Sequence, residues 1–180
     1  MSTTETKTTW ALDPTHSELL FKVKHLMITN VKGEFRSFDA TLESIGTEVS
    51  KASVTATVQA DSIFTNNTDR DNHLRSADFF DVENHRELTF EGSSFTKLDD
   101  DNYQLKGNLT IKGITKEISL DVEFGGIAKD PWGNEKAGFS LSGKINRKDW
   151  GLNWNAALEA GGVMVSDDVR INGEVQFVKQ

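Results

Sequence analysis

Apolar residues recur at every second position over most of this chain, and this alternation constrains the fold more than any other feature. In residues 103–111, Tyr103, Leu105, Leu109 and Ile111 alternate with polar residues and one glycine. Successive side chains of a β-strand point to opposite faces, so a period of two places all the apolar residues on one face. Each such stretch is therefore predicted to be a strand with one buried and one solvated face.

One pair of strands can be aligned residue by residue from the sequence. A two-residue turn at Lys112-Gly113 would pair Ile111 with Ile114 in an antiparallel hairpin. The same register places Leu105 opposite Leu120, so that apolar residues meet apolar residues along both strands. This agreement between turn and pattern predicts a hairpin over residues 103–124.

The alternation predicts about eight strands in total, which makes the chain an all-β protein. An open sheet of this length would leave two unpaired edges and a large apolar face in water. Closing the sheet into a single antiparallel β-barrel removes both problems. We expect one barrel domain over residues 9–180, after a flexible tail over residues 1–8, with one or two short helices.

The alternation stops at residues 66–82, NNTDRDNHLRSADFFDV, where helical spacing replaces it. Leu74, Ala77 and Phe80 recur at three-residue steps, which predicts one apolar face of a short helix. Asn67 or Thr68 can cap its start. We interpret residues 66–82, called the plug below, as a segment that lies against the barrel. The alternative is a simple crossover between two parts of the sheet.

A second helix is an option at residues 25–30, HLMITN, where the alternation is also weak. Within the plug, Asp71 and Arg75 are four residues apart in the order that favours an ion pair. His73 lies close to Asp78 in sequence, and this pair could serve as general acid and base. The alternative for these charged residues is an ion-pair cluster on the surface of the helix.

Composition excludes several classes of function. The formal charge is −8, with 28 acidic and 20 basic residues, which argues against binding to nucleic acid or to an anionic membrane surface. The absence of cysteine excludes disulfides and thiolate chemistry. No apolar run has the length of a membrane span, so we expect no integral membrane segment.

The start of the chain, MSTTETKTT, contains no apolar segment of the kind found in secretory signals. We therefore expect a cytoplasmic protein from the sequence as written, and a periplasmic one if an N-terminal signal was removed. The four histidines lack the spacing of a zinc motif, so we expect no metal and no cofactor, and we assign no catalytic residue.

Two charged residues and four glycines stand out because they share the inward-facing phase of the predicted strands. Arg147 and Asp167 have matching phase near one end, where they would form a rim salt bridge or contact a ligand headgroup. Glycines with inward phase would leave a cavity unfilled or allow the strands to coil at barrel corners. These glycines are Gly33, Gly107, Gly143 and Gly173.

Four segments of the chain resemble the YceI-like family. They are WALDPTHSELLFKVKHL, RDNHLRSADFFDV, NLTIKGITKEISLDVEF and KDPWGNEKAGFSLSGKINRKDWGL, and the resemblance covers residues 10–178 in the family's order and spacing. It implies a lipocalin-like antiparallel barrel with a long apolar pocket for polyisoprenoid chains, including isoprenoid quinones. Many members are periplasmic with a cleaved signal, and this sequence departs from them in showing none.

Together, the pattern and the resemblance predict a non-enzymatic protein that holds a polyprenol, prenyl phosphate or isoprenoid quinone for storage or transport. Two alternatives remain open: an enzyme acting on such a lipid with His73, Asp78 or Arg147, and a stress-related interaction protein whose barrel is filled by side chains. Apart from the lipid, the one partner left open is a second copy of the chain. The predicted cavity residues are Leu19, Phe21, Val23, Phe35, Phe38, Phe79, Phe80, Phe90, Leu105, Leu109, Ile111, Leu120, Val122, Phe139, Leu141, Ile145 and Ile171.

Overall fold

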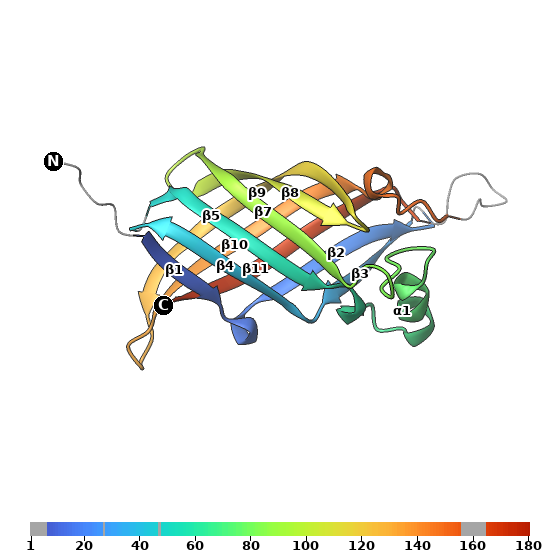
Figure 1. The fold of residues 1–180 in the computed structure, drawn as a ribbon, viewed down its shortest axis with the longest axis horizontal. Coiled ribbons are helices and arrows are strands. Elements are labelled where there is room, and N and C mark those ends of the chain that lie inside the picture. The colour runs from blue at the N-terminus through green and yellow to red at the C-terminus, as the bar shows by residue number, and fades with distance from the viewer. Residues whose placement is uncertain (1–6, 27, 47, 156–164) are drawn as a thin grey trace.

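The fold is a closed antiparallel β-barrel with one α-helix at one end (Figure 1). The computed structural model describes residues 7–26, 28–46, 48–155 and 165–180. The strands that close the ring are β1 (Lys7–Leu12), β4 (Phe38–Ile45), β5 (Glu48–Gln59), β7 (Glu87–Lys97), β8 (Asn102–Ile111), β9 (Ile114–Lys129), β10 (Glu135–Asn146) and β11 (Asp168–Lys179). The remaining elements are 3-10 helix η1 (Pro14–His16), β2 (Glu18–His25), β3 (Thr29–Phe35), η2 (Ala60–Ser62), β6 (Ile63–Phe64), α1 (Thr68–Arg75) and η3 (Arg147–Trp150).

These eight strands pair in the order β1-β4-β5-β7-β8-β9-β10-β11, and β11 pairs with β1 to complete the ring. All pairings are antiparallel, so the predicted fold class is confirmed. Residues 1–6 of the predicted tail lie outside the described residues, and β1 begins at Lys7.

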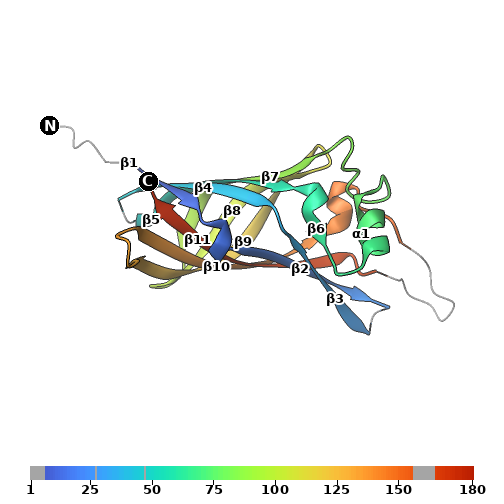
Figure 2. The same ribbon diagram turned by 90° about the horizontal axis from the view of Figure 1, so that it is seen from below.

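The two ends of the barrel differ because β11 has two partners along one edge. Its C-terminal part pairs with β1, for example Phe177 with Leu12, and its N-terminal part pairs with β2, for example Ile171 with Phe21. The turn at η1 separates β1 from β2. Beyond that turn β2 continues into β3 and β6 instead of closing the ring, and the β2–β3 hairpin splays away from the barrel (Figure 2).

The register of the β8–β9 hairpin is the one that the sequence predicts. Ile111 pairs with Ile114 and Leu105 with Leu120, across a turn in which Lys112 has a φ of 52°. A positive φ at both turn residues is typical of the two-residue turns whose twist matches that of the strands. The pattern of apolar residues therefore sets the register, and the turn accommodates it.

Side chains fill one end of the barrel. A cluster of buried residues around Trp10, Leu42, Tyr103, Phe139 and Phe177 packs where β1 closes the ring. A second cluster lies at the opposite end, beside α1 and the β2–β3 hairpin. We call these the closed end and the mouth.

The helix in the plug is shorter than the spacing of its apolar residues predicts. It ends at Arg75, and Ala77 is exposed in the turn that follows, so the predicted face of Leu74, Ala77 and Phe80 is wrong at Ala77. Asn67 caps the helix by accepting a hydrogen bond from the backbone N–H of Arg70, as predicted. The cap defines the start, and the Ser76 hydroxyl bonding back to the carbonyl of His73 helps define the end.

The described residues of the 25–30 segment, all except Met27, form no helix. His25 ends β2 and Thr29 begins β3, and between them Leu26 has a φ of 54°. The backbone N–H of Ile28 donates to the carbonyl of His25, which closes a tight hairpin turn. The weak alternation at this position therefore marks a turn rather than a helix.

Candidate ligand-binding cavity

A cavity of about 610 Å³ occupies the barrel interior between the closed end and the mouth. All seventeen residues predicted to line a cavity do line it, and so does Arg147, whereas Asp167 does not. Their contact with a ligand stays a prediction. The volume lies within the range of about 300–1,000 Å³ that is typical of small-molecule sites. A barrel filled by side chains, one of the alternatives from the sequence, is therefore wrong.

The cavity wall is apolar but incompletely covered. Leu19, Phe21, Leu141, Ile145 and Ile171 point into the barrel, yet each keeps an intermediate exposure instead of being buried. Side chains on the same strands at the closed end are buried, so the difference reflects the empty space beside them. An apolar ligand that covered this wall would remove it from water, which is the main source of affinity for such ligands.

The inward-facing glycines do not leave holes, because neighbouring side chains lie over them. A β-carbon at Gly33 would overlap the ring of Phe21, its direct cross-strand partner. A β-carbon at Gly173 would lie 2.9 Å from the side chain of Leu141, also its direct partner. The glycines thus let large side chains lie flat against the wall. The cavity interpretation is wrong for the volume at the glycines themselves.

The plug covers part of the mouth, as predicted. Leu74, Phe79 and Phe80 line the cavity, and Phe80 packs edge-on against Phe35 of β3 with ring centroids 5.8 Å apart. Phe79 is 7% exposed. A simple crossover between parts of the sheet would not require these contacts, so the structure favours the plug.

A buried carboxylate anchors α1 to the neighbouring strand. Asp71 is 4% exposed, and its Oδ1 accepts hydrogen bonds from the backbone N–H of Thr65 at 2.9 Å and from the hydroxyl of Thr65. Arg75 donates to the carbonyls of Asp61 and Ile63 instead of pairing with Asp71. The predicted Asp71–Arg75 ion pair is therefore wrong, because both side chains bind the segment before the helix.

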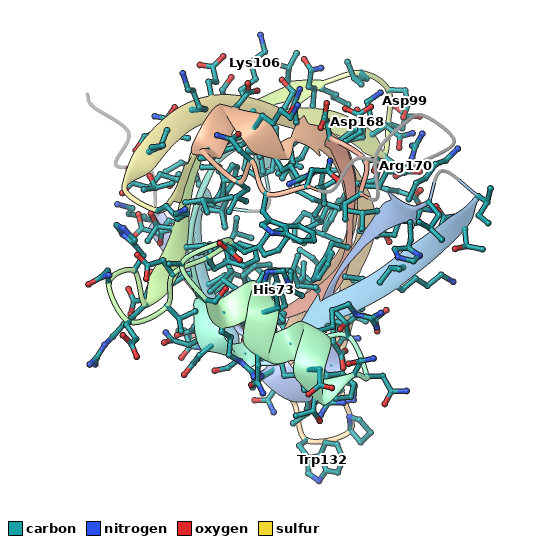
Figure 3. All side chains as sticks on the ribbon, turned by 90° about the vertical axis from the view of Figure 1, so that its right-hand side faces the viewer. His73, Asp99, Lys106, Trp132, Asp168 and Arg170 are labelled. Atoms are coloured by element: carbon teal, nitrogen blue, oxygen red, sulfur yellow. The ribbon has the colours of Figure 1, made fainter. Side chains whose placement is uncertain are left out.

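His73 faces the mouth from the inner side of α1 (Figure 3). Its Nε2 lies 2.9 Å from a carboxylate oxygen of Asp78. Its ring packs edge-on against Phe79 and Trp154, with centroids 5.2 and 4.7 Å away. The imidazole is thus held in place at the cavity, where a histidine–carboxylate pair has the chemistry for proton transfer.

Arg147 forms hydrogen bonds with the segment after β10 and does not form the predicted salt bridge. Its guanidinium donates to four backbone carbonyls, those of Leu152, Trp154, Val165 and Ser166. Burial lowers the pKa of Arg147, and the charge of Asp167 opposes this effect. Four of the five N–H groups of the guanidinium are already used, so this side chain is poorly placed to bind a headgroup.

Asp167 does not form the salt bridge predicted for it. Its backbone carbonyl accepts a hydrogen bond from the N–H of Arg147 at 2.9 Å, so the two residues are neighbours as expected. Its carboxylate instead lies 3.4 Å from the ammonium of Lys148. The predicted rim salt bridge with Arg147 is therefore wrong, and a headgroup contact by Asp167 stays a prediction.

The sequence did not reveal the polar residues that surround the mouth. Lys24, Thr65, Asp69 and Arg70 line the cavity there. Trp150, the last residue of η3, is 1% exposed, and its indole N–H donates a hydrogen bond to the carbonyl of Leu109. Alternation identifies the faces of strands, whereas most of these residues lie outside the strands: Asp69 and Arg70 are in α1, and Trp150 is in η3. The closely spaced tryptophans of residues 150–154 were the available signal.

Among the described residues, no helix combines the length and apolarity needed to cross a membrane. In the same part of the chain, no group of three or more histidine, aspartate and glutamate residues is arranged to hold a metal ion. The cavity and its mouth are thus the main candidate site.

The fold and the cavity define a lipocalin-like antiparallel barrel with an apolar interior and a partly covered mouth. A family model for the YceI-like domain matches residues 10–177. The chain belongs to the YceI-like family, and the predicted resemblance is confirmed.

Relatives of similar length support this assignment. A UPF0312 protein of Staphylococcus epidermidis is 45% identical over 171 residues, which cover 94% of this chain and 97% of the relative. The crystal structure of the Campylobacter jejuni YCEI protein aligns with a TM-score of 0.75 at 37% identity, over 88% of this chain and 91% of that one.

A more distant structure shares the fold. A domain from Saccharophagus degradans, described as a polyisoprenoid binding domain implicated in plant cell wall breakdown, aligns with a TM-score of 0.73. Its identity is 13%, and the alignment covers 95% of this chain and 98% of that one.

Proposed function

We propose that this protein binds one long-chain isoprenoid lipid, with the apolar chain inside the barrel, and that it stores or carries the lipid without changing it. The observation that carries the proposal is the half-buried apolar wall around a cavity of about 610 Å³. The wall has few polar groups away from the mouth, which favours a hydrocarbon chain over a polar ligand. The fold shared with the polyisoprenoid binding domain of Saccharophagus degradans is consistent with this choice.

Burial of apolar area supplies the affinity in this proposal, at about 25 cal/mol per Å² before the costs of ordering the ligand. Such contacts recognise length and shape rather than a headgroup. The proposal therefore extends to polyprenols, prenyl phosphates and isoprenoid quinones alike. The headgroup would lie at the mouth, near Arg70 and His73, which line that part of the cavity.

The first test asks what the barrel holds. The purified protein is extracted with organic solvent, and the extract is analysed by mass spectrometry before and after incubation with geranylgeraniol or a ubiquinone. We expect one bound isoprenoid per protein after incubation. Palmitate should displace the isoprenoid only when its concentration is much higher than that of the isoprenoid. Failure to take up either isoprenoid would sink the proposal.

A matched pair of variants tests where the chain lies. Ile171 points into the cavity, and its neighbour Asn172 is exposed on the outer face. In the empty barrel of Ile171→Asp, water can reach the carboxylate, so the fold should survive. A bound hydrocarbon would exclude that water at a cost of several kcal/mol, or at least about a hundredfold in affinity. Asn172→Asp should bind as the wild type does, and equal losses in the two variants would contradict the cavity site.

The enzyme alternative keeps one specific observation, the His73–Asp78 pair at the cavity mouth. Bound isoprenoid is expected to be recovered unchanged from the wild type and from Asp78→Asn. Conversion by the wild type, together with accumulation of unreacted lipid in Asp78→Asn, would establish the enzyme reading instead.

A further inference from the structure

A row of four cations crosses the outer face of the barrel close to the mouth. Lys144 of β10 pairs with Arg170 of β11, Arg170 pairs with Lys22 of β2, and Lys22 pairs with Lys32 of β3. The residues beside them in sequence, such as Phe21 and Ile171, line the cavity, so alternation directs the four cations outward. We call these four residues the cation row.

The row is unusual because most of its charges are not compensated. Lys144 lies 3.7 Å from Asp168, but within the part of the chain that the structure describes, Arg170, Lys22 and Lys32 form no ion pair. Directly opposed side chains in a sheet have β-carbons about 4.5–5.5 Å apart, and like charges at these positions are destabilising. The fold therefore bears an electrostatic cost that a bound anionic partner would relieve.

Protection of a sheet edge does not explain the row. Charged residues, especially lysine, discourage edge strands from pairing with other chains, which would account for Lys32 on β3. Lys22 and Arg170 are different, since each lies on a strand that is paired on both sides at that position. The net charge of −8 argued against an anionic membrane partner for the chain as a whole, whereas the cation row is a local basic face that the net charge does not reveal.

An exposed apolar side chain lies at the tip of the same hairpin. Ile28, in the turn between β2 and β3, is 79% exposed. Lys24 is exposed at the mouth, where it and His25 line the entrance of the cavity. In Figure 3 this hairpin projects from the mouth end, with Arg170 labelled beside it. The cation row, the apolar tip and the entrance thus belong to one region of the surface.

We propose that this region, the cation row together with Ile28, docks the protein on an anionic phospholipid bilayer, with the mouth close to the membrane. Each cation near an anionic lipid surface typically strengthens binding about fivefold. A single apolar side chain at a hairpin tip adds insertion into the headgroup region. The docking proposal depends only on this surface. The further idea that a docked protein exchanges isoprenoid with the membrane through the mouth rests on the proposed function.

The first experiment measures cosedimentation with phosphatidylcholine vesicles, with and without phosphatidylglycerol. The wild type should bind only the anionic vesicles, and added salt should weaken binding because it screens exposed charges. The triple variant Lys22→Gln/Lys32→Gln/Arg170→Gln should bind about a hundredfold more weakly. It should unfold at no lower temperature than the wild type, since it removes like-charge repulsion.

A control variant changes the net charge equally on another face. Lys97, Lys106 and Lys129 are exposed on strands β7, β8 and β9, and Lys97 and Lys129 end their strands at the closed end, away from the hairpin (Figure 3 labels Lys106). Replacing all three by glutamine should leave vesicle binding within about twofold of the wild type. An equal loss in both triple variants, or none in either, would overturn the docking surface.

The second experiment determines which end meets the bilayer, using the absence of cysteine for single-site labelling. Trp132 lies in the β9–β10 turn at the closed end and is 84% exposed. It is therefore about as exposed as Ile28, which lies at the mouth end of the barrel. Ile28→Cys carrying an environment-sensitive nitrobenzoxadiazole dye should shift to the blue on anionic vesicles, and labelled Trp132→Cys should not. A shift at Trp132 alone would refute the orientation.

Cavity binding is measured separately, so the two proposals can fail independently. The triple variant of the cation row should take up geranylgeraniol in solution as well as the wild type does. A wild type that docks but takes up no isoprenoid would defeat the proposed function and leave docking intact. Binding to heparin or to an acidic protein without binding to vesicles would overturn the docking proposal.

Discussion

Asp71→Ala should loosen the plug without unfolding the barrel. The carboxylate of Asp71 is buried and accepts two hydrogen bonds from Thr65, which is itself 5% exposed. Hydrogen bonds to a charged group contribute about 1.5–3 kcal/mol each, so the loss is about 3 kcal/mol once water has replaced part of it. All of this energy joins α1 to the residues before it. The cost should therefore appear as local opening of the plug.

A change of about 3 kcal/mol raises the local opening constant about a hundredfold. Amide hydrogen exchange, followed by mass spectrometry, should accelerate by about that factor over residues 68–82. Exchange over residues 103–124, in the β8–β9 hairpin, should not change, because those strands open only with the whole barrel. If the cavity holds an isoprenoid, its dissociation should also be faster.

The control is Asp69→Ala, a change in the first turn of the same helix. Asp69 is exposed, and no hydrogen bond or ion pair joins its side chain to other described residues. Its favourable interaction with the helix dipole is about 0.3–1 kcal/mol, so exchange should accelerate at most about fivefold. Exchange in Asp71→Ala that stayed within this smaller range would refute the anchoring role of the carboxylate.

Three further predictions concern the wall, the segment after β10 and the corner at η1. Gly143→Leu should keep the fold, because the closest neighbour of the new side chain is a movable side chain, and it should reduce isoprenoid uptake at least tenfold. Gly107→Leu should fail to fold, because its β-carbon would also lie 2.6 Å from a backbone carbonyl oxygen. Circular dichroism and uptake assays would contradict this prediction if both variants took up lipid. Arg147→Met should lower the free energy of unfolding by about 3–5 kcal/mol because it leaves buried carbonyls unpaired, and a urea titration showing a loss below about 1 kcal/mol would show that water replaces the guanidinium. Hydrogen bonds from Thr15 and His16 and the nearby ammonium of Lys136 hold the pKa of Asp13 well below its usual value. Asp13→Asn should therefore lower the free energy of unfolding by about 1 kcal/mol at neutral pH, and by progressively less as the pH falls below about 4. A loss that did not depend on pH would exclude the charge as the cause.

The sequence predicts the barrel wall well because each strand carries its own evidence. In the hairpin of β8 and β9, an alternating pattern and a two-residue turn specify the same register, and the structure has that register. In β7 the apolar residues Leu88 and Phe90 fall at even positions and Phe95 at an odd one, and a register shift between Gly92 and Ser94 separates them. Inward-facing residues follow from the alternation, which is why the predicted lining residues of the strands lie on the cavity.

The features that the sequence did not predict depend on hydrogen bonds between a side chain and residues outside its own helix or strand. Local spacing suggested an ion pair between Asp71 and Arg75, whereas in the structure the carboxylate of Asp71 accepts hydrogen bonds from Thr65. Phase suggested that Arg147 faces Asp167, but β10 ends before Arg147 and the side chain turns to carbonyls up to 19 residues away. A pattern within one strand does not reveal which backbone groups a neighbouring turn leaves unpaired.

The two partners of β11 separate folding from ligand exchange in this molecule. Next to β1, the closed end gathers most of the tightly packed side chains, and next to β2 lie the empty cavity, the plug and the splayed hairpin. Exposed residues around the mouth can therefore change, altering how fast or from where cargo enters, while the buried clusters at both ends keep the chain folded. A barrel designed to hold a new molecule could therefore carry substitutions at the exposed residues of the mouth and keep the closed end, next to β1, unchanged.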